Sequence, residues 1–246
     1  MSPRLIALPM GTRVVRISFF VVVLVLGSVP LSVGQPVPDP VPFCRESSRR
    51  AATPDTRGLG ALYCTTNDAL AGTLHGIHRS ARPVFYGAVP VAWGASALRD
   101  GDDFAAAYRL TVAQGGTYGL VLGLKHLVGR PRPFVTRALV SRASRYGPSQ
   151  GEQYQSFPTG HAALSAAIVT SVGLTHPRWY VLGPGAAWAA GVSLSRLYLG
   201  VHYPSDVIVG AALGVGVSVL VHQVRHAITP AAVGGDGTGV GVRMRF

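Results

Sequence analysis

The sequence is poor in lysine, acidic residues and cysteine. Lys125 is the single lysine among 22 basic residues, Asp and Glu together number 10, and only 13% of the residues are charged. Because 48% of the residues are hydrophobic, this composition excludes a disordered polybasic chain. Two cysteines in 246 residues also exclude a small scaffold held together by many disulfides. What remains is a folded, basic protein of one or two domains with a formal net charge of +12.

The first 34 residues have the layout of a secretory signal. Three arginines precede an apolar run over residues 17–26, Pro30 ends this run, and small residues follow at 32–34. A basic start, a short apolar stretch and a small-residue cleavage site are the three parts of a signal peptide. An uncleaved membrane anchor is the alternative, but the run is shorter than the about 18–20 residues that a span requires. The sequence therefore predicts a signal peptide at 1–34 and an exported mature chain.

The segments at the two ends of the mature chain lack apolar periodicity. Residues 35–58 are rich in proline and arginine, so we expect a linker there, and residues 229–246, rich in glycine, are expected to form a flexible tail. Export gives a role to the two cysteines, because Cys44 and Cys64 could form a disulfide in an oxidising compartment. Two free thiols are the alternative.

Six segments between the linker and the tail have the apolar pattern of helices, within one domain at 59–228. Asp102 and Asp103 are candidate caps of the third helix. The expected helices are 59–80, 83–98, a third that ends at about 128, 161–175, 178–199 and 205–226. Strand-like alternation occurs only at 240–246, and a single strand cannot close a barrel. The sequence predicts an all-α fold, a six-helix bundle.

Small residues recur at intervals of four in several of these helices, as at Gly115, Gly119 and Gly123. Such stripes are typical of contacts between membrane helices, but they also occur in tightly packed soluble bundles. The apolar stretches have about 15–19 residues, at the border between a core helix and a membrane span. We expect a membrane-embedded bundle, with a soluble bundle as the alternative.

The loop from Gly129 to Gly160 carries five arginines and a single acidic residue, Glu152. Connections longer than about 12–15 residues without secondary structure are usually functional or disordered. A group of arginines at the mouth of a helical bundle suggests an anionic substrate. A basic loop that faces solvent or lipid headgroups is the alternative.

Three separated motifs supply side chains suited to a phosphoryl group. They are Lys125–Pro133, Pro158–His161 and Ser195–Asp206. Arg132 and Arg196 offer planar guanidinium groups that bind phosphate oxygens in pairs, and Lys125 adds a compact charge. Thr159 offers a hydroxyl and Gly160 a backbone N–H at the start of a helix, where free amides favour an anion.

Two histidines and a carboxylate complete the candidate site. His202 precedes Asp206 by four residues, about one helical turn, so the carboxylate could fix the tautomer of the imidazole and leave its other nitrogen free to attack. His161 could protonate the leaving oxygen. Each residue alone has a structural interpretation, such as a helix cap or a buried histidine. Their joint occurrence at these spacings favours a catalytic site.

The three motifs resemble the signature of the type-2 phosphatidic acid phosphatase and vanadium haloperoxidase superfamily. That signature is Lys-x6-Arg-Pro, Pro-Ser-Gly-His and Ser-Arg-x5-His-x3-Asp, and the resemblance covers about residues 59–226. The chain departs from it once, with Thr159 in place of the usual serine. Threonine keeps the hydroxyl, so we expect phosphate binding to survive.

The resemblance implies a role for each matching residue. His202 would be the nucleophile that forms a phosphohistidine, Asp206 would hold it, and His161 would act as general acid and then activate water. The remaining residues would bind the phosphate and its transition state, namely Lys125, Arg132, Thr159, Gly160 and Arg196. The resemblance implies no metal and no cofactor, because cations and backbone amides neutralise the charge.

The main hypothesis is a metal-independent phosphatase that acts on phosphomonoesters or diphosphates. We expect a phosphorylated lipid or a small phosphoester as its substrate, a membrane as a partner, and no nucleic acid. We expect it in the inner membrane with its site facing the periplasm, or soluble in the periplasm. A soluble, non-specific acid phosphatase is the first alternative. A vanadate-dependent haloperoxidase and a non-enzymatic basic membrane protein are weaker ones.

Two pairs of histidines lie at helical spacing outside the motifs. These are His75 with His78 and His222 with His226. Each pair could share a helix face, but no third ligand lies nearby in the sequence. We therefore expect no metal site at either pair.

Overall fold

The computed structural model describes residues 41–98, 104–137, 139–143, 150–230 and 233. The expected signal peptide at 1–34 lies outside these residues, and so does the expected tail apart from 229, 230 and 233. The predicted caps Asp102 and Asp103 and the alternating segment 240–246 lie outside them as well.

The described chain confirms the predicted all-α fold, with no strand among its residues. Six helices have ten residues or more, which matches the expected number of main helices. These are α3 (Pro54–Tyr63), α4 (Asp68–Ala97), α5 (Ala105–Val128), α8 (Gly160–Thr175), α9 (Trp179–Tyr198) and α10 (Pro204–Gln223). The shorter helices are α2 (Val41–Ser47), α6 (Pro133–Thr136), α7 (Gln150–Gln153) and α11 (Arg225–Ile228).

The first two expected helices have different boundaries in the structure. The prediction placed them at 59–80 and 83–98, whereas α3 ends at Tyr63 and α4 continues through Pro83 and Pro90. The break comes earlier because Asn67 caps α4, its side chain accepting a hydrogen bond from the N–H of Leu70. Packing of α4 around Pro83 against Trp188 of α9 then outweighs the local penalty of a proline inside a helix.

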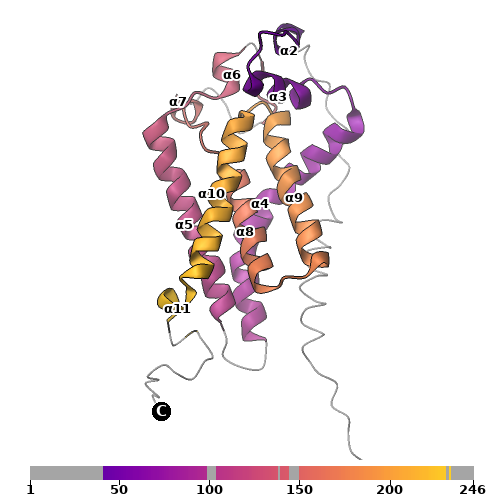
Figure 1. The fold of residues 1–246 in the computed structure, drawn as a ribbon. Coiled ribbons are helices and arrows are strands. Elements are labelled where there is room, and N and C mark those ends of the chain that lie inside the picture. Colours follow the sequence, from indigo (N-terminus) through magenta and orange to yellow (C-terminus); the bar gives the residue numbers. More distant parts are fainter. Residues whose placement is uncertain (1–40, 99–103, 138, 144–149, 231–232, 234–246) are drawn as a thin grey trace, which may run out of the picture.

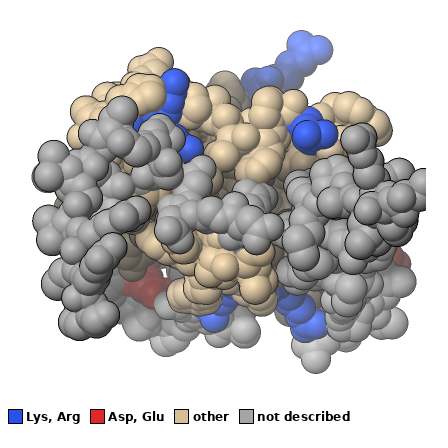
Figure 2. All heavy atoms as spheres, turned by 90° about the horizontal axis from the view of Figure 1, so that it is seen from below, with Lys and Arg blue, Asp and Glu red and all other residues tan. Residues whose placement is uncertain are grey.

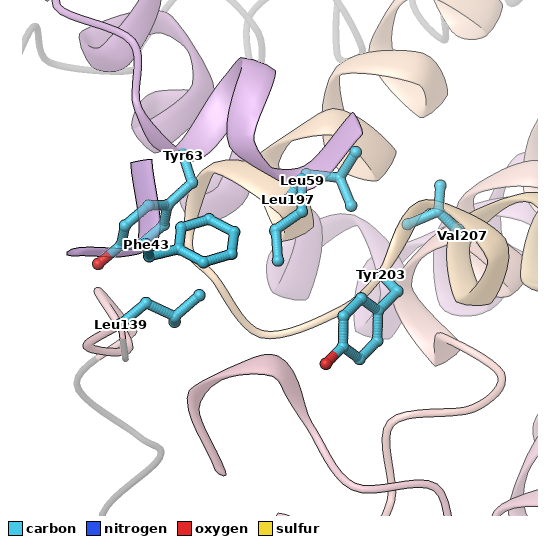
Figure 3. Packing of buried hydrophobic residues seen from close by; sticks show 8 residues of the cluster. Phe43, Leu59, Tyr63, Leu139, Leu197, Tyr203 and Val207 are labelled. Carbon is cyan, nitrogen blue, oxygen red and sulfur yellow. The ribbon is translucent and has the colours of Figure 1, made fainter. Parts of the chain in front are cut away.

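The segment expected to be a linker carries secondary structure in its described part. α2 and the start of α3 lie within residues 35–58, and Cys44 and Cys64 are joined by a disulfide across 20 residues. Figure 3 shows Phe43 and Tyr63 beside Leu139, and the same buried cluster includes Leu197 of α9 and Tyr203, which precedes α10. We call residues 41–64 the N-terminal cap, because they cover one end of the bundle (Figure 1).

α8 and α10 make a close helix contact. A Cβ atom on Gly214 would lie 2.0 Å from the carbonyl oxygen of Ala163, and one on Gly210 would lie 2.5 Å from that of Thr159. Only glycine permits this approach, because it places backbone against backbone. The contact brings the N-terminal ends of α8 and α10 together.

The motif-bearing helix ends all lie at one end of the bundle. In Figure 1, α5 ends, α8 begins, α9 ends and α10 begins at the upper end, where α2, α3, α6 and α7 also lie. The expected loop 129–160 therefore contains two short helices, α6 and α7, and runs across this end. The sequence elements of the candidate site converge there.

The outer surface of the bundle carries many exposed apolar side chains. They include Leu120 and Leu122 of α5, Trp179 and Leu194 of α9, and Ile208, Val215 and Leu220 of α10. Within the described part of the chain, α10 is the helix long and apolar enough to cross a membrane by length and composition. Figure 2 views the end opposite the cap, where the visible Lys and Arg side chains lie apart rather than in one patch.

Candidate active site

The structure brings the predicted site residues together in the interior of the cap end. Lys125 lies in the last turn of α5, Thr159 and His161 at the start of α8, and Arg196 in the last turn of α9. Arg132 precedes α6, while His202 and Asp206 lie on either side of the start of α10. The side chains of Arg132, Thr159, Arg196, His202 and Asp206 are all buried.

His202 is oriented by a main-chain carbonyl. Its Nδ1 lies 2.7 Å from the carbonyl oxygen of Ser156. Because a carbonyl can only accept a hydrogen bond, Nδ1 carries the proton, and the lone pair is left on Nε2. This Nε2 accepts from Nη1 of Arg132 at 3.2 Å. The nitrogen with the lone pair therefore points towards one of the predicted phosphate-binding groups.

Asp206 is connected to His202 through Ser156. Its Oδ2 lies 3.7 Å from Nδ1 of His202, which is too far for a hydrogen bond. The hydrogen bond that we expected between Nδ1 and Asp206 is formed with the Ser156 carbonyl. Instead, Oδ2 accepts from the Ser156 hydroxyl at 2.6 Å and from the N–H of Tyr203 at 2.9 Å. Asp206 thus holds the side chain of Ser156, and the main chain of Ser156 holds His202.

Arg130 completes the surroundings of Asp206. Its Nη1 donates to Oδ1 of Asp206 at 2.6 Å and to the hydroxyl of Ser205 at 2.7 Å, and its Nη2 donates to Asp55 at 2.8 Å. From the sequence alone, Arg130 is one of the five arginines of the loop and has no specific role. Its position two residues before Arg132 was the signal that could have singled it out.

The predicted phosphate-binding cations are hydrogen-bonded to the protein itself. Lys125 donates to the carbonyl of Gln155, and Arg132 donates through Nε to the carbonyl of Glu152 at 2.7 Å. Nη1 of Arg196 contacts Nδ1 of His78 at 2.9 Å. The segment 152–156, which includes the end of α7, therefore supplies main-chain carbonyls to Lys125, Arg132 and His202.

Oγ1 of Thr159 and Nε2 of His161 are buried atoms of the site without a hydrogen-bond partner among the described residues. The ring of His161 lies between His78 and Phe85, with centroid distances of 6.0 Å and 5.5 Å. Buried polar atoms are rarely unpaired in proteins, so this pair marks a place where a polar ligand would be bound.

His78 has a role that its spacing from His75 did not suggest. Its Nδ1 contacts Arg196, and the His75 ring lies 6.4 Å away, centroid to centroid. Because a guanidinium can only donate, the lone pair of His78 faces Arg196 and fixes the orientation of that arginine. The sequence predicts no metal site at the His75–His78 pair. In the structure, His78 is a hydrogen-bond partner of Arg196.

The pKa of His202 is lowered well below its usual value of 6.5. Burial is the main cause, and the nearby charges of Arg132, Lys125 and Arg196 add to it, while the hydrogen bond to Ser156 opposes it. All these cations disfavour a second positive charge. His202 is therefore a neutral imidazole at neutral pH, the form that can act as a nucleophile.

The sequence profile of the PAP2 superfamily matches residues 106–230, just over half of the 246 residues, and this span contains all the motif residues placed above. The chain belongs to the PAP2 superfamily. The match begins in α5 and ends after α11, so the N-terminal cap lies outside the matched residues. The cap packs on the matched part, because Phe43, Leu59 and Tyr63 share one buried cluster with Leu197, Tyr203 and Val207.

Individual PAP2 proteins resemble this chain over its central part. The lipid A 1-phosphatase of Rhizobium johnstonii is 37% identical over 99 residues, which are 39% of this chain and 38% of that protein. The undecaprenyl-diphosphatase of Sulfolobus acidocaldarius is 43% identical over 70 residues, 28% of this chain and 33% of that protein. The chain thus spans about two fifths or less of these curated relatives.

A solved PAP2 structure shares the fold. The transmembrane PAP2-type phosphatidylglycerolphosphate phosphatase from Bacillus subtilis aligns with a TM-score of 0.55 at 20% sequence identity, covering 86% of this chain and 96% of that one. At this identity the likeness concerns the arrangement of helices.

Proposed function

We propose that this PAP2 protein is a metal-independent phosphatase of membrane lipid phosphates or diphosphates. The observation that carries the proposal is the geometry of His202, whose proton is held on Nδ1 by Ser156 while Nε2 faces Arg132. This is the arrangement of an activated nucleophile beside the group that would hold its target. The names of the two PAP2 relatives, both phosphatases of lipid substrates, support the same class of reaction.

The first step would transfer the phosphoryl group to the enzyme. Nε2 of His202 attacks phosphorus, the bond from phosphorus to the ester oxygen breaks, and its electron pair passes to the leaving oxygen. His161 gives that oxygen a proton. Arg132, Arg196 and Lys125 stabilise the charge that builds up on the other oxygens. The Nδ1 proton stays on His202, shared with the Ser156 carbonyl.

The second step would release phosphate. A water molecule attacks the phosphorus of the phosphohistidine, the phosphorus–nitrogen bond breaks, and its electron pair returns to Nε2 of His202. His161 takes the proton from the water and is thereby restored as the acid for the next cycle. Protein groups supply every proton and charge in this sequence, so the proposal requires no metal.

A membrane location is supported by the surface and by the cap. Exposed apolar side chains lie on α5, α9 and α10, and α10 has the length and composition of a span. The disulfide between Cys44 and Cys64 lies at the site end, and such bonds persist in oxidising compartments. We infer that the bundle is embedded in a membrane with the site end on the exported side.

A substrate panel tests this function. The full chain in detergent is given undecaprenyl diphosphate, phosphatidylglycerophosphate, phosphatidic acid and the soluble ester p-nitrophenyl phosphate, each with and without EDTA. We expect kcat/KM to be at least about tenfold higher for one of the lipids than for the soluble ester, because binding of the lipid chains contributes to the transition state. EDTA should leave every rate unchanged.

Two outcomes would contradict the proposal. Equal kcat/KM for the soluble and the lipid substrates, together with release of the protein from membranes by a salt wash, would favour a soluble acid phosphatase. Loss of activity in EDTA that is restored by one added metal ion would overturn the metal-independent mechanism.

The lowered pKa of His202 predicts activity at acidic pH. For an imidazole with the usual pKa of 6.5, the neutral fraction would fall about eightfold between pH 7 and pH 5.5. His202 keeps its neutral form over this range, so kcat/KM should fall less than threefold once the titration of the substrate, followed by ³¹P NMR, is taken into account. An eightfold fall with a midpoint near 6.5 would contradict the pKa shift.

A further inference from the structure

An acidic residue of the N-terminal cap reaches the groups that hold the nucleophile. Oδ2 of Asp55 accepts from Nη2 of Arg130 at 2.8 Å and from the Ser205 hydroxyl at 2.6 Å, and Oδ1 accepts from the N–H of Ser205 at 2.9 Å. Arg130 uses its other nitrogen for Asp206, at 2.6 Å. One guanidinium therefore bridges a carboxylate of the cap and the buried carboxylate of the site.

The charges at this bridge are fixed. The hydrogen bonds from Ser205 and Arg130 outweigh the effect of burial on Asp55 and hold its pKa below the usual 3.8. Burial would lower the pKa of Arg130, but Asp55 and Asp206 together raise it. The guanidinium also stacks on Tyr203, 4.4 Å from the ring centroid. Asp55 is thus an anion and Arg130 a cation at every pH at which the enzyme would work.

The cap holds Asp55 in place by contacts of its own. Thr53 caps α3 by accepting from the N–H of Thr56, and the disulfide joins the end of α3 to α2. The hydroxyl of Tyr63 donates to the carbonyl of Val140 and accepts from its N–H, at 3.0 and 3.1 Å. Asp55 is therefore presented to Arg130 from a rigid element, as a positioning group requires.

We propose that Asp55 and Arg130 are positioning residues for the reaction, acting in series through Asp206 and Ser156 on His202. The proposal rests on the phosphatase function inferred above. Neither residue is placed to touch the phosphoryl group. Asp55 orients Arg130, Arg130 fixes Asp206, Asp206 holds the Ser156 hydroxyl, and the Ser156 carbonyl sets the ring of His202. The cap would thus take part in positioning the nucleophile, although it lies outside the residues that match the PAP2 profile.

A second ion pair offers a matched control. Glu46 of the cap pairs with Arg137 of the loop after α6, so it also joins the cap to the site end. Within the described part of the chain, neither Glu46 nor Arg137 forms a hydrogen bond with Asp206 or Ser156. Glu46→Gln therefore removes one cap-to-loop ion pair without touching the series of contacts that leads to His202.

The test compares Asp55→Asn, Glu46→Gln, Arg130→Gln and the double variant Asp55→Asn with Arg130→Gln, all in the full chain. We expect kcat to fall about tenfold in Asp55→Asn and about 100-fold in Arg130→Gln, with KM within twofold of the wild type, because misplacing a catalytic group affects the chemical step. The double variant should equal Arg130→Gln, since Asp55 acts through Arg130. Arg130→Lys, which keeps the charge but cannot bridge both carboxylates, should recover part of kcat.

The outcomes separate this proposal from the function on which it rests. If the wild type releases phosphate and Asp55→Asn behaves like Glu46→Gln, positioning by Asp55 is wrong and the phosphatase function stands. Positioning by Asp55 is also wrong if the fall in kcat of the double variant is the product of the two single falls. It is equally wrong if Asp55→Asn raises KM and leaves kcat unchanged. If the wild type releases no more phosphate than His202→Ala, the proposed function fails, and the positioning roles fail with it.

Discussion

Replacing His202 by alanine should lower kcat for phosphate release by at least about 10⁴-fold, since no other group can take over as the nucleophile. Nε2 of His202 carries the lone pair beside Arg132, and alanine removes it completely. The measurement is phosphate release from the best substrate of the panel, with purified protein. Acid-labile ³²P should be trapped on the wild type after rapid mixing with labelled substrate, and it should be absent from the variant.

His126→Ala is the matched control for this variant. His126 neighbours Lys125 in the sequence, but its side chain is exposed on α5, so the change should leave kcat within twofold. Equal thermal unfolding midpoints of the two variants would show that both retain the fold. Phosphate release by His202→Ala at the wild-type rate would overturn the phosphohistidine mechanism.

The largest effect on stability is expected at Gly214. Gly214→Ala places a Cβ atom 2.0 Å from the carbonyl oxygen of Ala163 and 3.0 Å from the nitrogen of Ala167, so α8 and α10 must move apart. We expect the free energy of unfolding to fall by about 3 kcal/mol, at the upper end of the range for overpacking. The measurement is the thermal unfolding midpoint in detergent, which should fall by about 10 °C.

Gly216 in the same helix gives the control. A Cβ atom there meets nothing within 4 Å, so Gly216→Ala should leave the free energy of unfolding unchanged or raise it by up to about 1 kcal/mol through better helix propensity. Equal midpoints for the two variants would mean that the α8–α10 contact can relax at no cost. The contact would then not fix the position of Thr159 and His161.

The motif residues could be predicted from sequence because each one is tied to a helix end. Lys125 ends α5, His161 follows the first residue of α8, and Arg196 lies in the last turn of α9. Apolar runs and helix-start signals place such ends within a few residues, and antiparallel helices joined by short loops bring them to the same end of a bundle. The location of the site therefore follows from local signals.

The hydrogen bonds of Asp206 could not be predicted, because the spacing argument assumed that His202 lies within the helix. α10 begins at Pro204, so His202 precedes its N-cap, Tyr203, and Asp206 is the third residue of the first turn. There the carboxylate accepts from the N–H of Tyr203, as in a capping box. The four-residue interval then no longer corresponds to one helical turn, and Ser156, 50 residues earlier, fills the gap.

Asp55 and Ser156 carried no sequence signal for a related reason. Both form hydrogen bonds between segments far apart in the chain, and neither lies in a periodic pattern or beside a motif histidine. The start of α3 did carry a local signal, since Thr53 and Pro54 are a favourable N-cap and first residue. The surrounding prolines and arginines hid this signal, and the segment was assigned to a linker.

If the proposed function holds, a phosphoryl group would compete with the protein for two of its cations. The carbonyls of Gln155 and Glu152 already accept hydrogen bonds from Lys125 and Arg132, and these N–H groups would have to exchange a carbonyl for a phosphate oxygen. The affinity for phosphate is then a difference between two sets of similar hydrogen bonds, which keeps product binding weak. The carbonyls of Glu152 and Gln155 would thus compete with the product, and their return to Arg132 and Lys125 after hydrolysis would help to expel it.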